Sequence, residues 1–326
     1  NCLSVVPVET EYGAKRAIDQ SSCNKDFSCV DGFCPSFVTV HGGAIRKLKV
    51  NTPDASAALA NLPVPQVAAL DGPYGIVVAG VGGTGVITIG SLLGMAAHIE
   101  GLGCTVLDQT GLAQKGGAVL SHVRIAPQPQ DLGAVRIDTG GARLLLAADM
   151  VVAAGAQAIA MVDPESARVV VNSHEIPTAI STLTPDGDLH ADELRARLRD
   201  SVGAGRSDFV DASAIATALF GDSIATNLFL LGFALQKGCI PVGLDALRKA
   251  IEVNGVTVER NLATLDWGRL AAHDMASVER ALGMTPAAED PKPEDKLDAI
   301  VSRRAAFLTD YQNEAYARRY RDLVER

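Results

Sequence analysis

The stretch YGIVVAGVGGTG, residues 74–85, decides the fold. It begins with an apolar run that is typical of a buried strand, and a segment of helical periodicity follows it. Glycines permit a tight turn and let backbone N–H groups approach an anion at a helix N-terminus. They also let a strand and a helix pack closely without any ligand. The candidate phosphate-binding residues of this turn are Gly80, Gly82, Gly83, Thr84 and Gly85.

Strands and helices alternate on the C-terminal side of this turn. The apolar patterns predict strands at residues 75–79, 104–107, 118–125, 150–153, 168–171 and 209–210. They predict helices at residues 85–101, 212–220, 224–237, 244–253 and 258–270. This alternation indicates an α/β fold, so we expect a Rossmann-like layered domain with a largely parallel sheet over residues 74–288.

A second glycine pair lies between the strands predicted at residues 104–107 and 118–125. Lys115, Gly116 and Gly117 occupy this loop, and loops at one edge of an α/β sheet converge on a single crevice. Lys115 would then add positive charge beside the first turn, unless it is a solvated surface lysine. Asp108 lies about 20 residues after the glycine turn, which also fits a fingerprint for NAD.

Four of the six cysteines fall within the first 34 residues. Four thiolates suit either a [4Fe-4S] cluster or tetrahedral zinc. Zinc sites usually contain a pair of cysteines with two to four residues between them, and the closest pair here, Cys29 and Cys34, is at the upper limit with four, whereas Pro after the last cysteine is typical of ferredoxins. Disulfides would need an oxidising compartment. We therefore expect Cys2, Cys23, Cys29 and Cys34 to hold a [4Fe-4S] cluster, with zinc and disulfides as alternatives.

The other reactive side chains indicate no catalytic chemistry. Cys104 is predicted on a buried strand and Cys239 follows a predicted helix, so both are expected to be inert thiols. His122 and Arg124 share a face of one predicted strand, but the sequence places no acidic or nucleophilic partner beside them. No catalytic acid, base or nucleophile is therefore assigned.

Composition excludes several classes of protein. The net charge of −9 and the aromatic content of 4% disfavour a nucleic-acid-binding surface. The longest apolar stretch, residues 224–235, is shorter than the roughly 20 residues that a membrane span needs. No secretory signal precedes the cysteines. We expect a soluble cytoplasmic protein that binds neither nucleic acid nor membrane.

The two ends of the chain differ from its centre. Residues 1–50 have little apolar material and little periodicity, so we expect a small irregular iron–sulfur segment that a cluster holds together, although residues 46–50 could form a strand. Residues 297–326 are predicted to form one helix. We expect a slice of a longer protein. Its parts would be a cluster segment at 1–50, a linker at 51–73 with a short helix at 55–60, the α/β domain at 74–288, and the start of a helical domain at 289–326.

Three stretches resemble the γ domain of 2-oxoacid:ferredoxin oxidoreductases: Gly80 to Ala126, Asn227 to Gly232 (NLFLLG) and Val258 to Leu262 (VERNL). The segments NCLSVVPVETE and IDQSSCNKDFSCVDGFCPSFVTV are similar to the ferredoxin-like insert of large fused indolepyruvate ferredoxin oxidoreductases. The final YQNEAYARRYRDLVE resembles the opening of the helical domain that follows in those chains.

This resemblance implies oxidative decarboxylation of a 2-oxo acid to an acyl-CoA, with electrons passing through [4Fe-4S] clusters to ferredoxin. It implies that thiamine diphosphate and Mg²⁺ are bound by other domains of a homo-oligomeric parent enzyme, not by this chain. The glycine turn would contact the pyrophosphate of CoA, or the domain would only dock against the thiamine-binding domains. An NAD-dependent dehydrogenase and a zinc-stapled interaction module stay open as alternatives.

Overall fold

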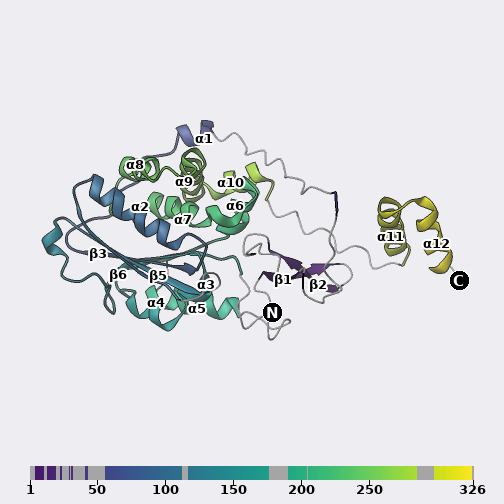
Figure 1. The fold of residues 1–326 in the computed structure, drawn as a ribbon, viewed down its shortest axis with the longest axis horizontal. Helices are drawn as coiled ribbons and strands as arrows, with labels where there is room; N and C mark the ends of the chain where they lie inside the picture. The colour runs from purple at the N-terminus through teal and green to yellow at the C-terminus, as the bar shows by residue number, and fades with distance from the viewer. Residues whose placement is uncertain are drawn as a thin grey trace. The chain divides into compact units, whose positions relative to one another are not determined.

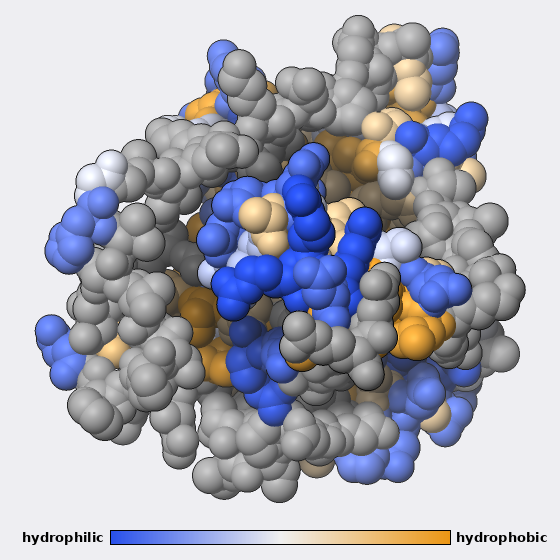
Figure 2. Space-filling model, turned by 90° about the vertical axis from the view of Figure 1, so that its right-hand side faces the viewer, coloured by the Kyte–Doolittle hydropathy of each residue, from blue (hydrophilic) through white to orange (hydrophobic). Residues whose placement is uncertain are grey.

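The structure is a computed structural model, and it describes residues 4–10, 13–19, 23, 29, 31, 41–42, 56–111, 117–175, 190–203, 205–284 and 297–324. The chain divides into two compact units, Asn1–Leu282 and Gly283–Arg326, and each is described by itself. None of the helices among the described residues is long and apolar enough to cross a membrane. Figure 2 shows that both hydrophilic and hydrophobic side chains of the described residues reach the surface on the face drawn.

A six-stranded sheet forms the centre of the first unit (Figure 1), in the order β4-β5-β3-β6-β7-β8. Strands β3, β6, β7 and β8 run parallel, whereas β5 runs antiparallel to both of its neighbours. The prediction of a largely parallel sheet is therefore confirmed, with one antiparallel strand inserted in it. The strands are β3 (Tyr74–Val81), β4 (Gly103–Gln109), β5 (Ala118–Ala126), β6 (Ala142–Ala147), β7 (Arg168–Asn172) and β8 (Ser207–Val210).

Helices cover both faces of this sheet (Figure 1). One face carries α2 (Val86–Ile99), α6 (Ala212–Phe220) and α7 (Thr226–Gln236), with α8 (Leu244–Asn254) and α9 (Val258–His273) packed outside them. The other face carries α3 (Met150–Ala153), α4 (Ala156–Met161) and α5 (Ala191–Val202). Shorter elements complete the unit: α1 (Ser56–Ala60), α10 (Met275–Leu282), and the 3-10 turns η1 (Pro129–Asp131) and η3 (Ser223–Ala225).

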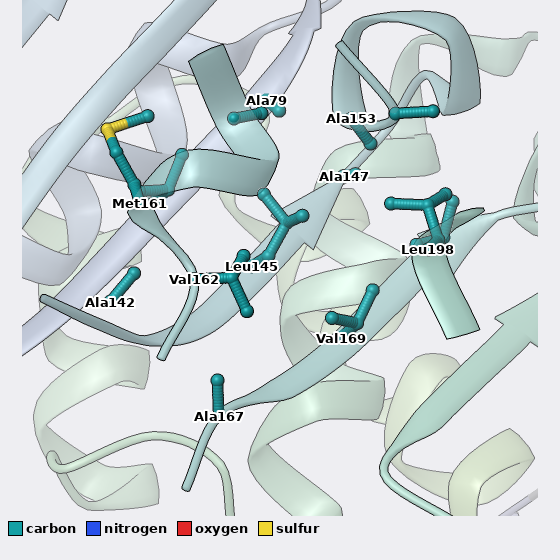
Figure 3. Close-up of a cluster of buried hydrophobic side chains, with 14 of the residues drawn as sticks. Ala79, Ala142, Leu145, Ala147, Ala153, Met161, Val162, Ala167, Val169 and Leu198 are labelled. Carbon is teal, nitrogen blue, oxygen red and sulfur yellow. The ribbon is translucent and has the colours of Figure 1, made fainter. Parts of the chain in front are cut away.

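The core lies between the sheet and these helices. Leu145 and Val169 point from β6 and β7 toward Met161 of α4 and Leu198 of α5, and all four side chains are buried (Figure 3). Each fully buried aliphatic side chain of this size contributes about 1.5–3 kcal/mol of transfer free energy. This layer therefore holds the sheet rigid beneath the loops at its edge.

Helices α7 and α9 cross in backbone contact. A Cβ atom on Gly232 would overlap the carbonyl oxygen of Leu265, and one on Gly268 would overlap the carbonyl oxygen of Phe229. Since a side chain of any size would push the helices apart, glycine is required at both positions.

The strand predicted at residues 150–153 is wrong, because these residues form helix α3. The strand in this region is β6 (Ala142–Ala147), which lies just before them. Asp149 separates the two apolar runs, and its carboxylate accepts the N–H of Val152 at 2.7 Å and caps the helix. Sequence patterning does not distinguish a short buried strand from a buried helix, so the wrong run was assigned to the sheet.

The N-terminal segment contains a hairpin. Strands β1 (Val5–Thr10) and β2 (Gly13–Ile18) pair antiparallel, so the prediction of a wholly irregular segment is wrong for these residues. The strand considered at residues 46–50 lies outside the described residues.

The second unit contains two helices, α11 (Leu297–Tyr311) and α12 (Glu314–Val324). The single helix predicted over residues 297–326 is wrong, because Asn313 breaks it. The side-chain oxygen of Asn313 accepts the N–H of Tyr316 at 2.9 Å and so begins the second helix. The rings of Phe307 and Tyr311 stack with centroids 6.4 Å apart.

Candidate functional site

A cavity of about 760 Å³ opens where β3 ends and α2 begins. This volume lies within the usual range for small-molecule sites, about 300–1,000 Å³. The cavity is lined by the glycine turn with the start of α2, by the end of β4 and the start of β5, by η3 with the start of α7, and by the first turn of α9. Its lining includes Val81, Gly82, Gly83, Thr84, Gly85, Ile87, Gly111, Asp222, Ile224, Asn227, Val256, Thr257, Arg260 and Asn261.

The glycine turn directs the N-terminus of α2 at this cavity. Gly83 and Gly85 have φ angles of 89° and 94°, in the left-handed region that favours glycine. The hydroxyl of Thr84 donates to the carbonyl of Val81 at 2.7 Å and so is used within the turn. No side chain caps α2, so its first N–H groups face the cavity unbonded by any cap. The helix dipole therefore places partial positive charge at this end of the cavity.

Two of the predicted site glycines, Gly80 and Gly82, make structural contacts. A Cβ atom on Gly80 would lie 2.7 Å from Cγ2 of Val86, so this glycine lets β3 and α2 pack closely. The N–H of Gly82 donates to the carbonyl of Gly117 at 2.8 Å, because β3 pairs with β5. The second glycine loop thus ends beside the first turn, as expected. Lys115 and Gly116 lie outside the described residues.

Asn227 supports the glycine turn from helix α7. This side chain is buried, and its amide Nδ2 donates to the carbonyl oxygen of Thr84. The bond occupies a carbonyl that would repel an anion. It uses none of the N–H groups at the start of α2. The only sequence signal for Asn227 was the resemblance of its segment to the oxidoreductase γ domain, which assigned it no role.

Arg260 is a second functional candidate that sequence reasoning did not identify. It lies in the first turn of α9 and lines the cavity, and its guanidinium carbon lies 5.3 Å from the centroid of the Phe220 ring. Its Nη2 is buried and has no hydrogen-bond partner in the described part of the chain. Thr257, at the start of α9, does not cap the helix with its side chain. Asp222 also lines the cavity, and its carboxylate accepts the N–H of Ile224 at 2.9 Å.

The strand order disfavours the NAD fingerprint. In that fingerprint the acidic residue ends the strand next to the glycine-rich one. Here β5 lies between β3 and β4, so Asp108 is two strands, or about 10 Å, away from β3. Asp108 pairs instead with Ser121 across the β4–β5 ladder. The carboxylate is therefore displaced from the position at which it would bind a ribose.

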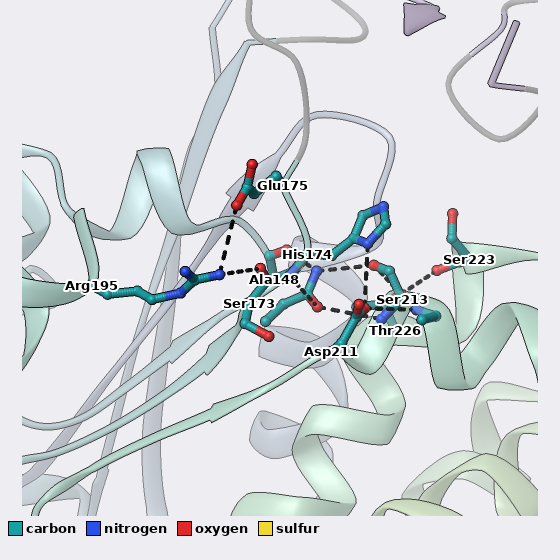
Figure 4. Close-up of polar contacts among 11 residues, drawn as sticks. Ala148, Ser173, His174, Glu175, Arg195, Asp211, Ser213, Ser223 and Thr226 are labelled. Atoms are coloured by element: carbon teal, nitrogen blue, oxygen red, sulfur yellow. Dashed lines mark hydrogen bonds and ion pairs between the residues drawn. The ribbon is translucent and has the colours of Figure 1, made fainter. Parts of the chain in front are cut away.

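A polar network lies at the carboxyl ends of β6, β7 and β8 (Figure 4). Asn172 donates to the carbonyl of Ala148 at 3.0 Å and to the hydroxyl of Ser213 at 2.9 Å. Ser213 in turn lies 3.1 Å from the hydroxyl of Thr226. These contacts join the strand ends to the starts of α6 and η3–α7, so the network fixes the scaffold beside the cavity.

His174 and Asp211 form an ion pair at the edge of this network, with Nδ1 and Oδ1 3.3 Å apart (Figure 4). The hydrogen bond to Asp211 raises the pKa of His174. Burial raises the pKa of Asp211, but the bonds from His174 and from the N–H of Ala214 outweigh it, so the net shift is downward. Both side chains are about half exposed, so this pair adds little to the stability of the fold.

Burial shifts the pKa of three of the remaining titratable candidates, Cys104, Cys239 and His122. Burial raises the pKa of Cys104 and of Cys239 to about 11, so both thiols are protonated and weakly reactive near neutral pH. Burial lowers the pKa of His122, and its Nδ1 accepts the N–H of Ile137 at 3.3 Å. Arg124 donates to the carbonyl of Ala134 at 2.9 Å. His122 and Arg124 therefore stabilise the loop after β5.

The predicted cluster ligands are only partly described. Cys29 is exposed and Cys23 is partly buried, whereas Cys2 and Cys34 lie outside the described residues. The described residues contain no group of three metal-binding side chains. The [4Fe-4S] assignment thus stays a prediction.

Comparison with known proteins places the α/β unit in a family. Residues 75–271 match the model of the pyruvate ferredoxin/flavodoxin oxidoreductase family. Residues 297–326 match a family of unknown function, DUF6537. Indolepyruvate oxidoreductase subunit IorB of Archaeoglobus fulgidus is 32% identical over 196 residues, which cover 59% of this chain and 92% of the relative. The same subunit of Thermococcus kodakarensis is 26% identical over 62% of this chain and 97% of the relative.

Two solved structures are also similar at low identity. The pyruvate oxidoreductase subunit PORC of Thermotoga maritima is 19% identical, with a TM-score of 0.44 over 61% of this chain and 96% of the other. The γ subunit of a keto/oxoacid ferredoxin oxidoreductase of Geobacter sulfurreducens is 23% identical, with a TM-score of 0.42 over 61% of this chain and 98% of the other. The family match over residues 75–271 spans more than half of the sequence, and the chain therefore belongs to the pyruvate ferredoxin/flavodoxin oxidoreductase family.

Proposed function

We propose that this chain works within a 2-oxoacid:ferredoxin oxidoreductase of the indolepyruvate type. In this reaction a 2-oxo acid loses CO₂, its acyl group passes to CoA, and the released electrons pass through [4Fe-4S] clusters to ferredoxin. Thiamine diphosphate and Mg²⁺ would be bound by the thiamine-binding domains against which this chain docks, in a homo-oligomeric enzyme. Family membership and the names of the relatives support this proposal.

The observation that carries the role of this chain is the uncapped N-terminus of α2, which faces a cavity of about 760 Å³. Backbone N–H groups at a helix N-terminus bind phosphate, and the glycines of the turn let it approach closely. The cavity also exposes the apolar side chains of Ile87, Ile224 and Val256. This combination suits a ligand with both a pyrophosphate and apolar parts, so the pyrophosphate of CoA would lie at the turn.

In the same proposal Lys115, Gly116 and Gly117 complete the phosphate site. Gly117 lies beside Gly82, to which its carbonyl is hydrogen-bonded. Lys115, two residues earlier, would supply positive charge next to the pyrophosphate.

The N-terminal cysteines would pass electrons onward. Four thiolates are the ligand set of a [4Fe-4S] cluster, and Cys2, Cys23, Cys29 and Cys34 supply that number. Protein purified anaerobically should contain iron and sulfide and absorb broadly near about 400 nm. Cys29→Ser should lower the iron content, whereas Cys239→Ser, at a buried thiol, should not. Stoichiometric zinc without iron would contradict this assignment.

Titration with CoA tests the proposed site. We expect the chain to bind CoA and NADH not to displace it, because Asp108 lies too far from β3 to bind a ribose. Failure of CoA to bind, both to this chain and to the intact oxidoreductase, would overturn the proposed site. Tight binding of NADH in competition with CoA would favour a nucleotide-dependent dehydrogenase instead.

A further inference from the structure

The first turn of α9 provides the cavity with hydrogen-bond donors separate from those of the glycine turn. No side chain caps this helix, which begins after Thr257. Asn261 lines the cavity, but its amide Nδ2 already donates to the carbonyl of Val256 at 2.9 Å. The guanidinium of Arg260 is thus a side-chain donor on this side with unused capacity, beside the uncapped N–H groups of the helix.

Arg260 is fixed in place without a charged partner. Its guanidinium carbon lies 5.3 Å from the centroid of the Phe220 ring, a cation–π contact that restricts the side chain. None of the ion pairs found among the described residues involves Arg260, and its buried Nη2 lacks an acceptor there. Leaving a buried guanidinium N–H group unbonded costs free energy, which an anionic ligand would recover. An arginine that is held in position and lacks an acceptor is suited to bind an anion.

Asp222 limits where in the cavity that anion binds. Its carboxylate also lines the cavity, and it caps η3 by accepting the N–H of Ile224. An anion beside Asp222 would be repelled. The two favourable positions are therefore the uncapped start of α2 and the first turn of α9 with Arg260.

We propose that Arg260 binds the 3′-phosphate of CoA, which makes it a specificity-determining residue. This inference rests on the proposed function, in which the glycine turn binds the pyrophosphate. CoA has two anionic centres, the pyrophosphate and the phosphate on its ribose, and the cavity has two separate sets of donors. A terminal phosphate offers several oxygens to one guanidinium, which matches the forked geometry of arginine. Dephospho-CoA keeps the pyrophosphate but lacks this second anion.

Binding of CoA and dephospho-CoA to the full chain, measured by calorimetry, tests the proposal. The native protein should bind CoA at least ~10-fold more tightly than dephospho-CoA, since a hydrogen bond to a charged group contributes about 1.5–3 kcal/mol. Arg260→Gln should weaken CoA binding ~10- to 100-fold and leave the affinity for dephospho-CoA within about 2-fold. Arg280→Gln removes the same charge from an exposed side chain of α10, outside the cavity, and should change neither affinity.

Several other results would contradict the role proposed for Arg260. Equal affinities in the native protein, or an equal loss for both ligands in Arg260→Gln, would overturn the role of Arg260 while CoA binding itself stands. Absence of binding by either ligand would overturn the proposed function together with this inference. If Arg260→Gln does not fold, Arg260→Lys keeps the charge but loses the fork, and an unchanged preference for CoA in that variant would overturn the proposal.

Discussion

The crossing of α7 and α9 and the turn between β3 and α2 both depend on glycine, for opposite reasons. At the crossing, Cβ atoms on Gly232 and Gly268 would overlap backbone oxygens of the facing helix. At the turn, the nearest atom to a Cβ on Gly85 would be Nδ2 of Asn227, at 3.6 Å. Gly85 is required there by its φ of 94° and not by crowding. Glycine thus permits close packing at the helix crossing, and it permits a left-handed backbone at the turn beside the cavity.

The largest effect should follow from crowding the helix crossing. Gly268→Ala is expected to lower the free energy of unfolding by about 3 kcal/mol or more, because a Cβ would overlap the backbone oxygen of Phe229. Thermal or denaturant unfolding measures the loss. Gly133→Ala is the matched control, since a Cβ there would meet nothing within 4 Å. Equal stability of the two variants would show that the crossing is not in backbone contact.

A change in the turn should affect binding more than stability. Gly85→Ala forces a side chain into the left-handed region at a cost of about 1–2 kcal/mol, and it disturbs the N–H groups that face the cavity. Gly101→Ala imposes similar strain after the C-terminal end of the same helix, at a φ of 75° and with open space around it. Both variants should lose similar stability, but only Gly85→Ala should lose CoA affinity. Equal CoA affinities of the two variants would show that the turn does not contribute to CoA binding.

Removing the support of the turn should have a smaller effect. Asn227→Ala deletes the hydrogen bond to the carbonyl of Thr84, which is worth about 1–2 kcal/mol of stability in a buried position. The freed carbonyl should also weaken CoA binding. Asn254→Ala, at the exposed end of α8, is the control and should bind CoA normally. Retention of full CoA affinity by Asn227→Ala would limit Asn227 to a structural role.

The smallest effect should come from changes in the polar network beside the cavity. This network holds the scaffold elements together and does not contact the ligand. The pKa of His174 is raised from 6.5, so its contribution to stability is present below this value and is lost as pH rises through the raised pKa. The pKa of Asp211 is lowered from 3.8, so its contribution is present above this value. The pair therefore stabilises the fold most between these two values.

Unfolding of His174→Gln at pH 5.5 and at pH 8 measures this contribution. The variant should be destabilised by less than about 1 kcal/mol at the lower pH, because both partners are half exposed, and by less still at the higher pH. A greater loss at pH 8 would contradict the assignment. Unchanged CoA affinity is expected at either pH.

The sequence predicts much of the fold because β3, the glycine turn and α2 follow one another along the chain. The direction of β5 was not predictable. Periodicity predicts which side chains share a face of a strand, but it does not predict the neighbouring strands or the strand's direction in the sheet. Strand β6 and helix α3 were confused because both are short and apolar. Asn227 contacts Thr84 from 143 residues away, so only the packing of α7 against α2 could reveal it. Arg260 was missed for the same reason, because its contacts come from a different helix.

A structure of the protein with CoA bound tests the central claim most directly, because it locates the pyrophosphate. Pyrophosphate oxygens should lie within about 3 Å of the backbone nitrogens at the start of α2, between Gly83 and Val86. A pyrophosphate bound elsewhere, with this cavity empty at saturating CoA, would contradict that claim.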